Sequence, residues 1–188
     1  QTFAALAVSS IAGYGFEIYH DKAKDTVMAI LMLAMMVPFV AVLVPLFQMF
    51  TKAKLINSWT GFILPSIATP FLIMYFRNSA RSFPRDTLEA ARIDGLNEFQ
   101  IFIRMFIPMM KPTYASAATI TFMGAWNAYL WPKVVMQTNE AITMPMLVAN
   151  TMGGYVIDYG VVMAAVTICS LPTVIIFFCL QKSFTNAV

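Results

Sequence analysis

The chain has 188 residues, of which 60% are hydrophobic and 11% are charged, and its formal net charge is +3. Ordinary soluble domains contain about 45–50% apolar and about 25% charged residues, so this composition excludes a water-soluble globule. The weak and scattered positive charge also provides no basic stripe that could bind a nucleic acid. We therefore expect an all-α polytopic membrane protein that forms a single domain over residues 1–188.

The first apolar stretch, residues 2–19, follows Gln1 directly and runs into a polar turn from Glu17 to Asp25. No basic segment precedes it, as a signal peptide would require. We therefore expect residues 2–19 to be a partial membrane span, the remainder of a longer helix.

Four further stretches have the length of about 20 mostly apolar residues that a membrane-spanning helix needs. They cover residues 27–50, 59–76, 113–132 and 160–181. Each contains or ends in proline, which removes a backbone donor and tends to kink a helix. Several kinked spans favour a bundle around a transport pathway, although kinked helices also occur for structural reasons alone.

The basic residues divide unequally between the two sides of the expected membrane. If residues 77–111 face the cytosol, nine lysines and arginines lie on that side and three on the other. Because cytoplasmic loops are enriched in Lys and Arg, we expect a cytosolic loop at 77–111, a cytosolic C-terminus and an outer loop at 133–159. In the outer loop, the run from Ile142 to Tyr155 predicts a short surface helix and a turn at Gly153-Gly154, with an irregular connection as the alternative.

The cytosolic loop carries two helix start signals and one stop signal. Asp86 and Glu89 have the spacing of a capping box, and so have Asn97 and Gln100. Gly95 lies between them, where a helix commonly ends in a left-handed residue. The pattern predicts two short helices that meet at an angle at Gly95 and lie across the membrane face, where a partner protein could grip them. An amphipathic hairpin that rests on lipid headgroups is the alternative.

This loop also carries a spaced motif. It consists of Glu89-Ala90-Ala91, three residues, Gly95, nine residues, and then Met105-Phe-Ile107-Pro108. The spacing resembles the EAA loop of ATP-binding-cassette (ABC) importer permeases, where Ile and Leu are usual at the positions of Met105 and Ile107. A later segment resembles the carbohydrate-uptake branch in particular, and within it the smaller permease subunit of maltose-type importers: Gly124-Ala-Trp126-Asn127-Ala-Tyr129-Leu-Trp131-Pro132. The resemblance covers essentially the whole chain.

The resemblance implies the transmembrane-domain fold of a type I ABC importer in the bacterial cytoplasmic (inner) membrane. That fold has six core helices, of which this chain offers five, the first of them partial. The implied partners are a second homologous permease subunit, an ATPase dimer and an extracytoplasmic solute-binding protein. ATP and magnesium would bind the ATPase, and this chain would hold no cofactor, no metal and no catalytic residue. The residues that would dock on the ATPase are Glu89, Ala90, Ala91, Arg92, Asp94 and Gly95.

The resemblance also suggests contacts outside the cytosolic loop. The outer loop would contact the binding protein through Thr151, Gly153, Gly154, Tyr155 and Asp158. On chemical grounds, the residues that could hold a sugar are Gln48, Trp126, Asn127 and Tyr129. Aromatic residues also favour membrane interfaces, and an intramembrane Asn commonly links helices, so a structural role is the alternative for each.

The cargo and the class of transporter leave alternatives. The same mechanism could carry glycerol phosphate or a polyamine in place of a sugar. An ion-driven secondary transporter would need acidic groups within the membrane, and the four complete spans contain no Asp or Glu. A metal site or an active site is not indicated either, since the single histidine, His20, lacks suitably spaced Cys or carboxylate neighbours.

Overall fold

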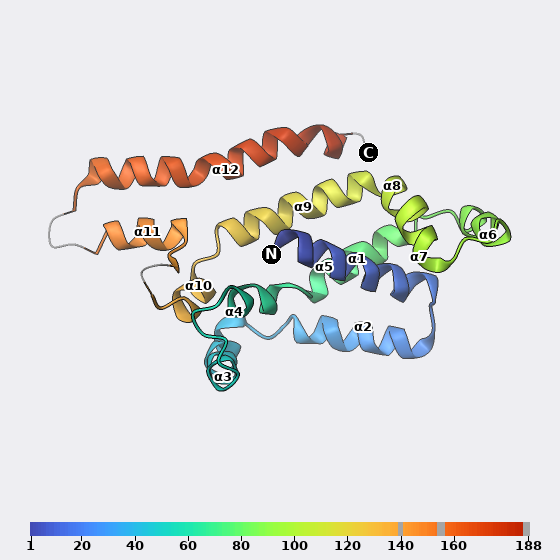
Figure 1. Ribbon diagram of the computed structural model, residues 1–188, viewed down its shortest axis with the longest axis horizontal. Coiled ribbons are helices and arrows are strands. Elements are labelled where there is room, and N and C mark those ends of the chain that lie inside the picture. The colour runs from blue at the N-terminus through green and yellow to red at the C-terminus, as the bar shows by residue number, and fades with distance from the viewer. Residues whose placement is uncertain (139–140, 154–156, 186–188) are drawn as a thin grey trace.

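The computed structural model describes residues 1–138, 141–153 and 157–185, with side chains as far as Cys179. All regular secondary structure in these ranges is helical (Figure 1). The helices are α1 (Thr2–Ile18), α2 (Lys22–Ala34), α3 (Phe39–Lys52), α4 (Trp59–Ile63), η1 (Leu64–Ser66), α5 (Pro70–Ala80), α6 (Arg85–Ile93), α7 (Glu98–Ile101), the π-helical η2 (Phe102–Phe106), α8 (Ile107–Met109), α9 (Lys111–Trp126), α10 (Leu130–Val135), α11 (Met144–Thr151) and α12 (Tyr159–Thr185).

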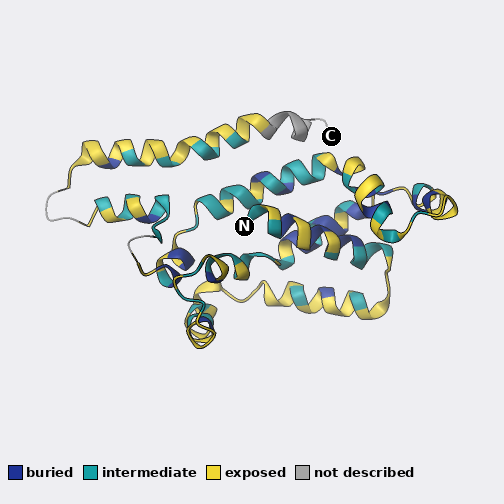
Figure 2. Cartoon of the chain, viewed as in Figure 1, coloured by how far each residue is buried: buried dark blue, intermediate teal, exposed yellow. Residues whose placement is uncertain are grey.

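The centre of the molecule is the packing of α1 against α5, with α9 beside them (Figures 1 and 2). Small residues on one face of α1 allow this close approach. At Gly13, an added Cβ would lie 2.6 Å from Phe76 Cβ and 2.9 Å from the Ile73 carbonyl oxygen. Ala5 and Phe76 are fully buried in the same layer. The two helices therefore form a tight pair that any larger residue at position 13 would force apart.

The stretch 27–50, predicted as one span with two prolines, contains two helices with a sharp bend between them. The helix that begins at Lys22 ends at Ala34, and α3 begins at Phe39 after a bend of 101°. Pro38 causes the break, because the residue before proline is pushed out of the helical region. Pro38 itself is extended, with a ψ of 133°, and caps α3. As a result, α3 lies across the direction of α2.

The other predicted spans also differ in detail from the helices. The stretch 59–76 forms α4, η1 and α5, with a bend of 48° before Pro70, which opens α5. The stretch 113–132 is divided, since α9 ends at Trp126 and α10 begins at Leu130. In the described residues, Tyr159–Cys179 within α12 is the one helix long and apolar enough to cross a bilayer alone, and the two bent pairs would raise the number to three.

The end of the molecule near α3 has its own hydrophobic cluster. Trp131 and Val135 of α10 are buried there against Phe50 of α3. The ring centroids of Phe50 and Trp131 are 5.2 Å apart, and the Trp131 indole N–H donates to the Gly61 carbonyl at 3.2 Å. The segment predicted to be the outer loop contains the short helix α11, as expected from the sequence.

Candidate functional site

The predicted corner at Gly95 is present at one end of the molecule, where α6 lies crosswise to the long helices (Figure 1). We call residues 85–101 the α6–α7 corner. Gly95 has a φ of +79°, and its N–H donates to the Arg92 carbonyl at 3.1 Å. The next N–H, of Leu96, donates to the Ala91 carbonyl at 3.1 Å. These two bonds form a Schellman motif, which ends α6 and satisfies two of its last carbonyls.

The two predicted capping boxes have different outcomes. The box at α7 is confirmed: the Gln100 N–H donates to Asn97 Oδ1 at 2.9 Å, and the Asn97 N–H donates to Gln100 Oε1 at 3.0 Å. The box at Asp86 and Glu89 is wrong. The N-cap of α6 is Pro84, two residues before Asp86, so that the helix begins at Arg85 and has no side-chain cap. Asp86 therefore lies in the first turn, where a carboxylate still interacts favourably with the helix dipole.

A π-helical turn, η2, connects the α6–α7 corner with α8 and α9. The Ile107 N–H donates to the Phe102 carbonyl, five residues earlier. Pro108 explains the widening, because it has no N–H for the Arg104 carbonyl and its ring would clash with that group in a regular helix. The widened turn directs Phe102 and Phe106 into the same cluster.

Helix α6 has two faces with different roles. Leu88 and Ala91 are buried, with 6% and 2% exposure, in the chain's own core. Glu89, Ala90, Arg92 and Asp94 are exposed, in agreement with a surface that could receive a partner. Ala91 thus serves the internal packing of the corner and does not lie on its outer face.

Two exposed apolar residues of the corner were missed by the sequence interpretation. Ile93 is 86% exposed and Phe99 is 68% exposed. They lie on opposite sides of Gly95 in the sequence. Ile93 lies two residues after Ala91 and so leaves the face that Leu88 and Ala91 share, which is the signal that could have identified it, whereas Phe99 has helical spacing with Phe102 and Phe106 and gives no such signal. Both side chains are available for contact with a partner protein.

An aromatic cluster supports the corner from beneath. Tyr14 of α1 contacts Phe102 and Phe106 edge-on, with ring centroids 5.2 Å and 4.9 Å apart. Phe83, which follows α5, contacts Phe106 in the same manner at 5.5 Å. Leu88 and Ala91 belong to this cluster. The α6–α7 corner therefore packs against the ends of α1 and α5 through these aromatic rings.

A charge pair also joins the two helices of the corner. The Arg92 Nε donates to Glu98 Oε1 at 2.8 Å. This hydrogen bond lowers the pKa of the Glu98 carboxyl below its usual value, while partial burial acts in the opposite direction.

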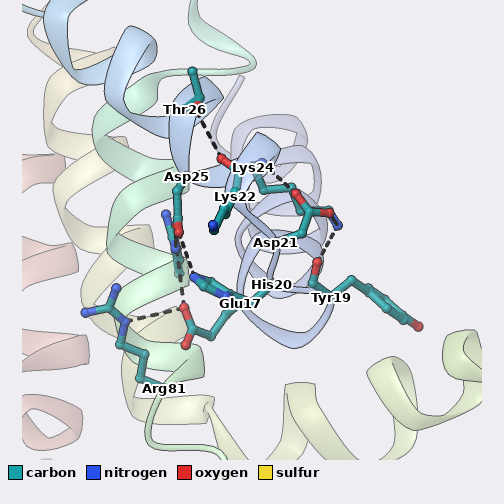
Figure 3. A network of polar contacts seen from close by, with 10 residues as sticks. Glu17, Tyr19, His20, Asp21, Lys22, Lys24, Asp25, Thr26 and Arg81 are labelled. Atoms are coloured by element: carbon teal, nitrogen blue, oxygen red, sulfur yellow. Dashed lines mark hydrogen bonds and ion pairs between the residues drawn. The ribbon is translucent and has the colours of Figure 1, made fainter.

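A second polar network lies at the same end of α1 and α5 (Figure 3). We call it the Arg77 network. Arg77, with a side chain only 7% exposed, pairs with Glu17 at 3.3 Å and with Asp25 at 2.5 Å. Arg81 shares Glu17 at 3.3 Å, and His20 Nε2 lies 2.9 Å from Asp25 Oδ2. The network ties α1, α2 and α5 together, and the sequence interpretation missed it because its members are far apart in the chain.

A polar cavity of about 140 Å³ separates α6 from this network. Its lining includes Glu17 and Arg81 on one side and Arg85, Glu89 and Arg92 on the other. The contact of α6 with the rest of the chain is thus concentrated at the aromatic cluster.

The proposed sugar-binding residues do not form one site in the structure. Trp126 stacks on Phe122, with centroids 5.9 Å apart, and its indole N–H donates to the Cys169 carbonyl of α12 at 2.9 Å. Asn127 donates to the Met123 carbonyl at 2.8 Å and lines a cavity of about 270 Å³ between α11 and α12. Tyr129 is exposed, and Gln48 lies exposed on a different helix, α3.

The proposed contacts in the outer loop are partly described. Thr151, at the end of α11, donates to the Val148 carbonyl at 2.7 Å, and Gly153 is exposed. Asp158 Oδ1 accepts the N–H groups of Gly160 and Val161 at 2.9 and 3.2 Å, so its side chain caps α12. Gly154 and Tyr155 lie outside the described residues.

Comparisons with known proteins agree with this architecture. The family described as "Binding-protein-dependent transport system inner membrane component" matches residues 5–188. The lactose transport system permease protein LacG of Rhizobium radiobacter is 42% identical, over 98% of this chain and 68% of the relative. The arabinooligosaccharides transport system permease protein AraQ of Bacillus subtilis is 35% identical, over 98% of this chain and 66% of the relative.

The fold is also similar to a solved structure of a bacterial ABC transporter involved in the import of the acidic polysaccharide alginate. The TM-score is 0.84 at 23% identity, and the match covers 97% of this chain and 71% of that one. The chain spans about two thirds of the length of LacG and AraQ, the curated relatives that it matches.

Proposed function

The chain belongs to the family of binding-protein-dependent transport system inner membrane components, and we propose that it forms half of the pathway by which an ABC importer takes up a sugar or oligosaccharide. It is a non-catalytic permease subunit in this proposal. The partners are a second homologous permease, an ATPase dimer that binds and hydrolyses ATP, and an extracytoplasmic binding protein.

The α6–α7 corner is the observation that carries this proposal. It lies at one end of the molecule, with Glu89, Ala90, Arg92 and Asp94 exposed on it. A two-helix corner with charged and apolar side chains on its outer surface fits a cleft on a partner protein better than it fits lipid headgroups. In this proposal the ATPase docks there from the cytosolic side, and the C-terminus of this chain is cytosolic as well.

The support beneath the corner suggests how movement would be transmitted. Leu88 and Ala91 are embedded in the aromatic cluster, which is joined to α1 and α5. Close-packed side chains transmit displacement because they have little free volume to absorb it. When the two ATPase subunits close, the corner would move with them, and the tight α1–α5 pair would move as one body between inward-open and outward-open states.

The cargo is inferred from the names of the relatives. LacG and AraQ are permeases for lactose and for arabinooligosaccharides. A relative with 28% identity, UgpE of Yersinia pestis, is named for sn-glycerol-3-phosphate. The two closer of these three relatives favour a sugar, and glycerol phosphate is the second candidate. Among the residues proposed to contact the sugar, Asn127 is exposed and lines the cavity of about 270 Å³ between α11 and α12.

The proposal is tested by measuring uptake and ATP hydrolysis together, with the full-length permease and its partners in proteoliposomes. Glu89→Lys should abolish uptake and the stimulation of ATP hydrolysis by binding protein, while membrane insertion is unchanged. Asp86→Lys is the matched charge reversal on the same helix and should retain most of the uptake. If Glu89→Lys transports normally, the coupling role of the corner is excluded.

Gly95 offers a second test with its own control. An added Cβ meets nothing within 4 Å, so a substitution acts through the backbone φ of +79° alone. Gly95→Val should uncouple the transporter, because a β-branched residue resists this conformation. Gly95→Asn should retain activity, because Asn tolerates it. Equal activity of the two variants would show that the angle at Gly95 does not matter for coupling.

A further inference from the structure

Helix α3 lies at the end of α2 that points away from the α6–α7 corner and, like α6, lies crosswise. Figure 1 shows it nearly end-on, while α1, α2, α5, α9 and α12 follow the long axis. The bend of 101° after α2 sets this direction. If the long axis crosses the bilayer, α3 is therefore close to parallel with the membrane plane.

The residues of α3 divide into an apolar side and a polar side. The centre of the apolar side packs on α10 through Phe50, Leu46 and Leu43. Val40 and Val44 flank this contact and remain 66% and 62% exposed. The opposite side carries the exposed polar residues Gln48 and Lys52. An amphipathic helix with an apolar side wider than its protein contact is typical of a helix that lies in the membrane interface.

The position of α3 is fixed by the segment that follows it. Lys54 and Asn57 have positive φ values of 57° and 58°, and they form a tight turn back toward α4. The Asn57 N–H donates to the Val135 carbonyl at 2.8 Å, and Asn57 Oδ1 accepts the Gln137 N–H at 2.5 Å. These bonds hold the end of α3 on α10, so its direction is set by the fold.

The same end of α3 carries groups that suit lipid headgroups. Lys52 and Lys54 are exposed, and Trp59, just beyond the turn, is 67% exposed. Tryptophan favours the level of the headgroups, and lysine near the surface attracts anionic lipids.

We propose that α3 is an interfacial helix, with its apolar flanks in the lipid and with Lys52 and Lys54 against anionic phospholipid headgroups. The preceding helix, α2, also exposes apolar side chains, among them Ile30 and Leu33, 59% and 64% exposed. In this proposal, lipid covers the exposed apolar residues of both helices. Helix α3 would also fix the depth of the bundle in the bilayer.

Spin-label depth measurements test this placement. The full-length permease, assembled with its partners in lipid nanodiscs, receives a nitroxide at Val40→Cys, Val44→Cys or Thr51→Cys, with Cys169 and Cys179 replaced by Ser. The depth is obtained from collisions with oxygen and with a water-soluble nickel chelate. Val27→Cys and Leu33→Cys on α2 are the controls and should differ in depth by about 9 Å at about 1.5 Å per residue.

The three α3 labels should report the same shallow depth and remain accessible to oxygen. A depth that changes by about 16 Å from Val40 to Thr51 would overturn the proposal, because α3 would then continue the span. Labels shielded from both reagents would also overturn it, because a protein partner would then cover α3.

The headgroup contact is tested with a fluorescent bimane at Thr51→Cys. Brominated phosphatidylglycerol should be enriched around it over brominated phosphatidylcholine, by about fivefold for each lysine close to the surface. The variant Lys52→Gln with Lys54→Asn should abolish the difference, and Asn tolerates the left-handed backbone at position 54. Equal quenching by the two lipids in the unsubstituted protein would contradict the role of the lysines.

Discussion

Helices α6 and α3 both lie crosswise in the same bundle and differ in what their side chains offer. On α6, Leu88 and Ala91 point into the core, and the outer surface is charged. On α3, the exposed flanks are formed by valines, and the polar side carries Gln48 and Lys52. The crosswise orientation is common to both helices, and in our proposals their surface chemistry makes a protein the partner of α6 and a lipid the partner of α3.

The largest expected effect is the difference in stability between a variant of a buried side chain on α6 and a variant of an exposed side chain on α3. Leu88→Ala removes a side chain that is 6% exposed and should lower the free energy of unfolding by about 2–5 kcal/mol. Val44→Ala should change it by less than about 0.5 kcal/mol, because Val44 is 62% exposed. Thermal unfolding in detergent measures both. Equal losses would mean that the two crosswise helices are anchored alike.

The Arg77 network provides the next test, because it holds the ends of α1, α2 and α5 near α6. Arg77→Leu leaves Glu17, with a side chain 15% exposed, without its buried partner and should cost about 3 kcal/mol. Arg81→Leu is the matched control. Its side chain is 60% exposed, so the loss should stay below about 1 kcal/mol. Comparable losses in a thermal unfolding experiment would show that Arg77 is not the centre of the network.

A smaller effect concerns the tight pair that α1 and α5 form. Gly13→Ala places a Cβ 2.6 Å from Phe76 Cβ and should destabilise by about 1–3 kcal/mol through overpacking. Gly15→Ala, where a Cβ meets nothing within 4 Å, should stabilise α1 by about 0.5–1 kcal/mol. The melting temperatures should therefore shift in opposite directions. A shift in the same direction would contradict the close packing at Gly13.

The smallest predicted effect is the pH dependence of the Arg92–Glu98 pair. The hydrogen bond from Arg92 lowers the pKa of Glu98 in the folded protein. The pair therefore contributes fully to stability above the pKa of about 4.3 in the unfolded chain, and this contribution is lost as the pH falls through the pKa in the folded protein. The loss should stay below about 1 kcal/mol, since both side chains are about 40% exposed. Glu98→Gln should remove this part of the acid dependence, measured by thermal unfolding below pH 5. An unchanged acid profile in the variant would argue against the pair.

The sequence identified those parts of the corner that depend on neighbouring residues. Gly95 and the Asn97–Gln100 box were predictable because each forms bonds only with residues a few positions away. The Asp86–Glu89 box failed because Pro84, in an extended conformation, is the N-cap, two residues before Asp86. A local pattern gives the region of a helix start more securely than the exact residue.

Other features depended on contacts between distant segments. No local pattern indicates that Arg77 pairs with Glu17, which lies 60 residues away. The burial of Ala91 also follows from packing on the aromatic cluster, which the motif does not reveal. Pro38 was visible as a kink, but the sequence does not show how sharp the bend of 101° is. The contact of Phe50 with Trp131, which holds α3 in its crosswise position, joins residues far apart in the chain.

One measurement compares the two crosswise helices directly and tests the central claim that the α6–α7 corner carries the ATPase. A nitroxide at Ile93→Cys, where the native side chain is 86% exposed, is followed in nanodiscs before and after addition of the ATPase pair. We predict that the label becomes immobilised and shielded from the nickel chelate, while a label at Val44→Cys is unchanged. An Ile93 label that stays mobile and accessible in a fully assembled, transporting complex would contradict the account.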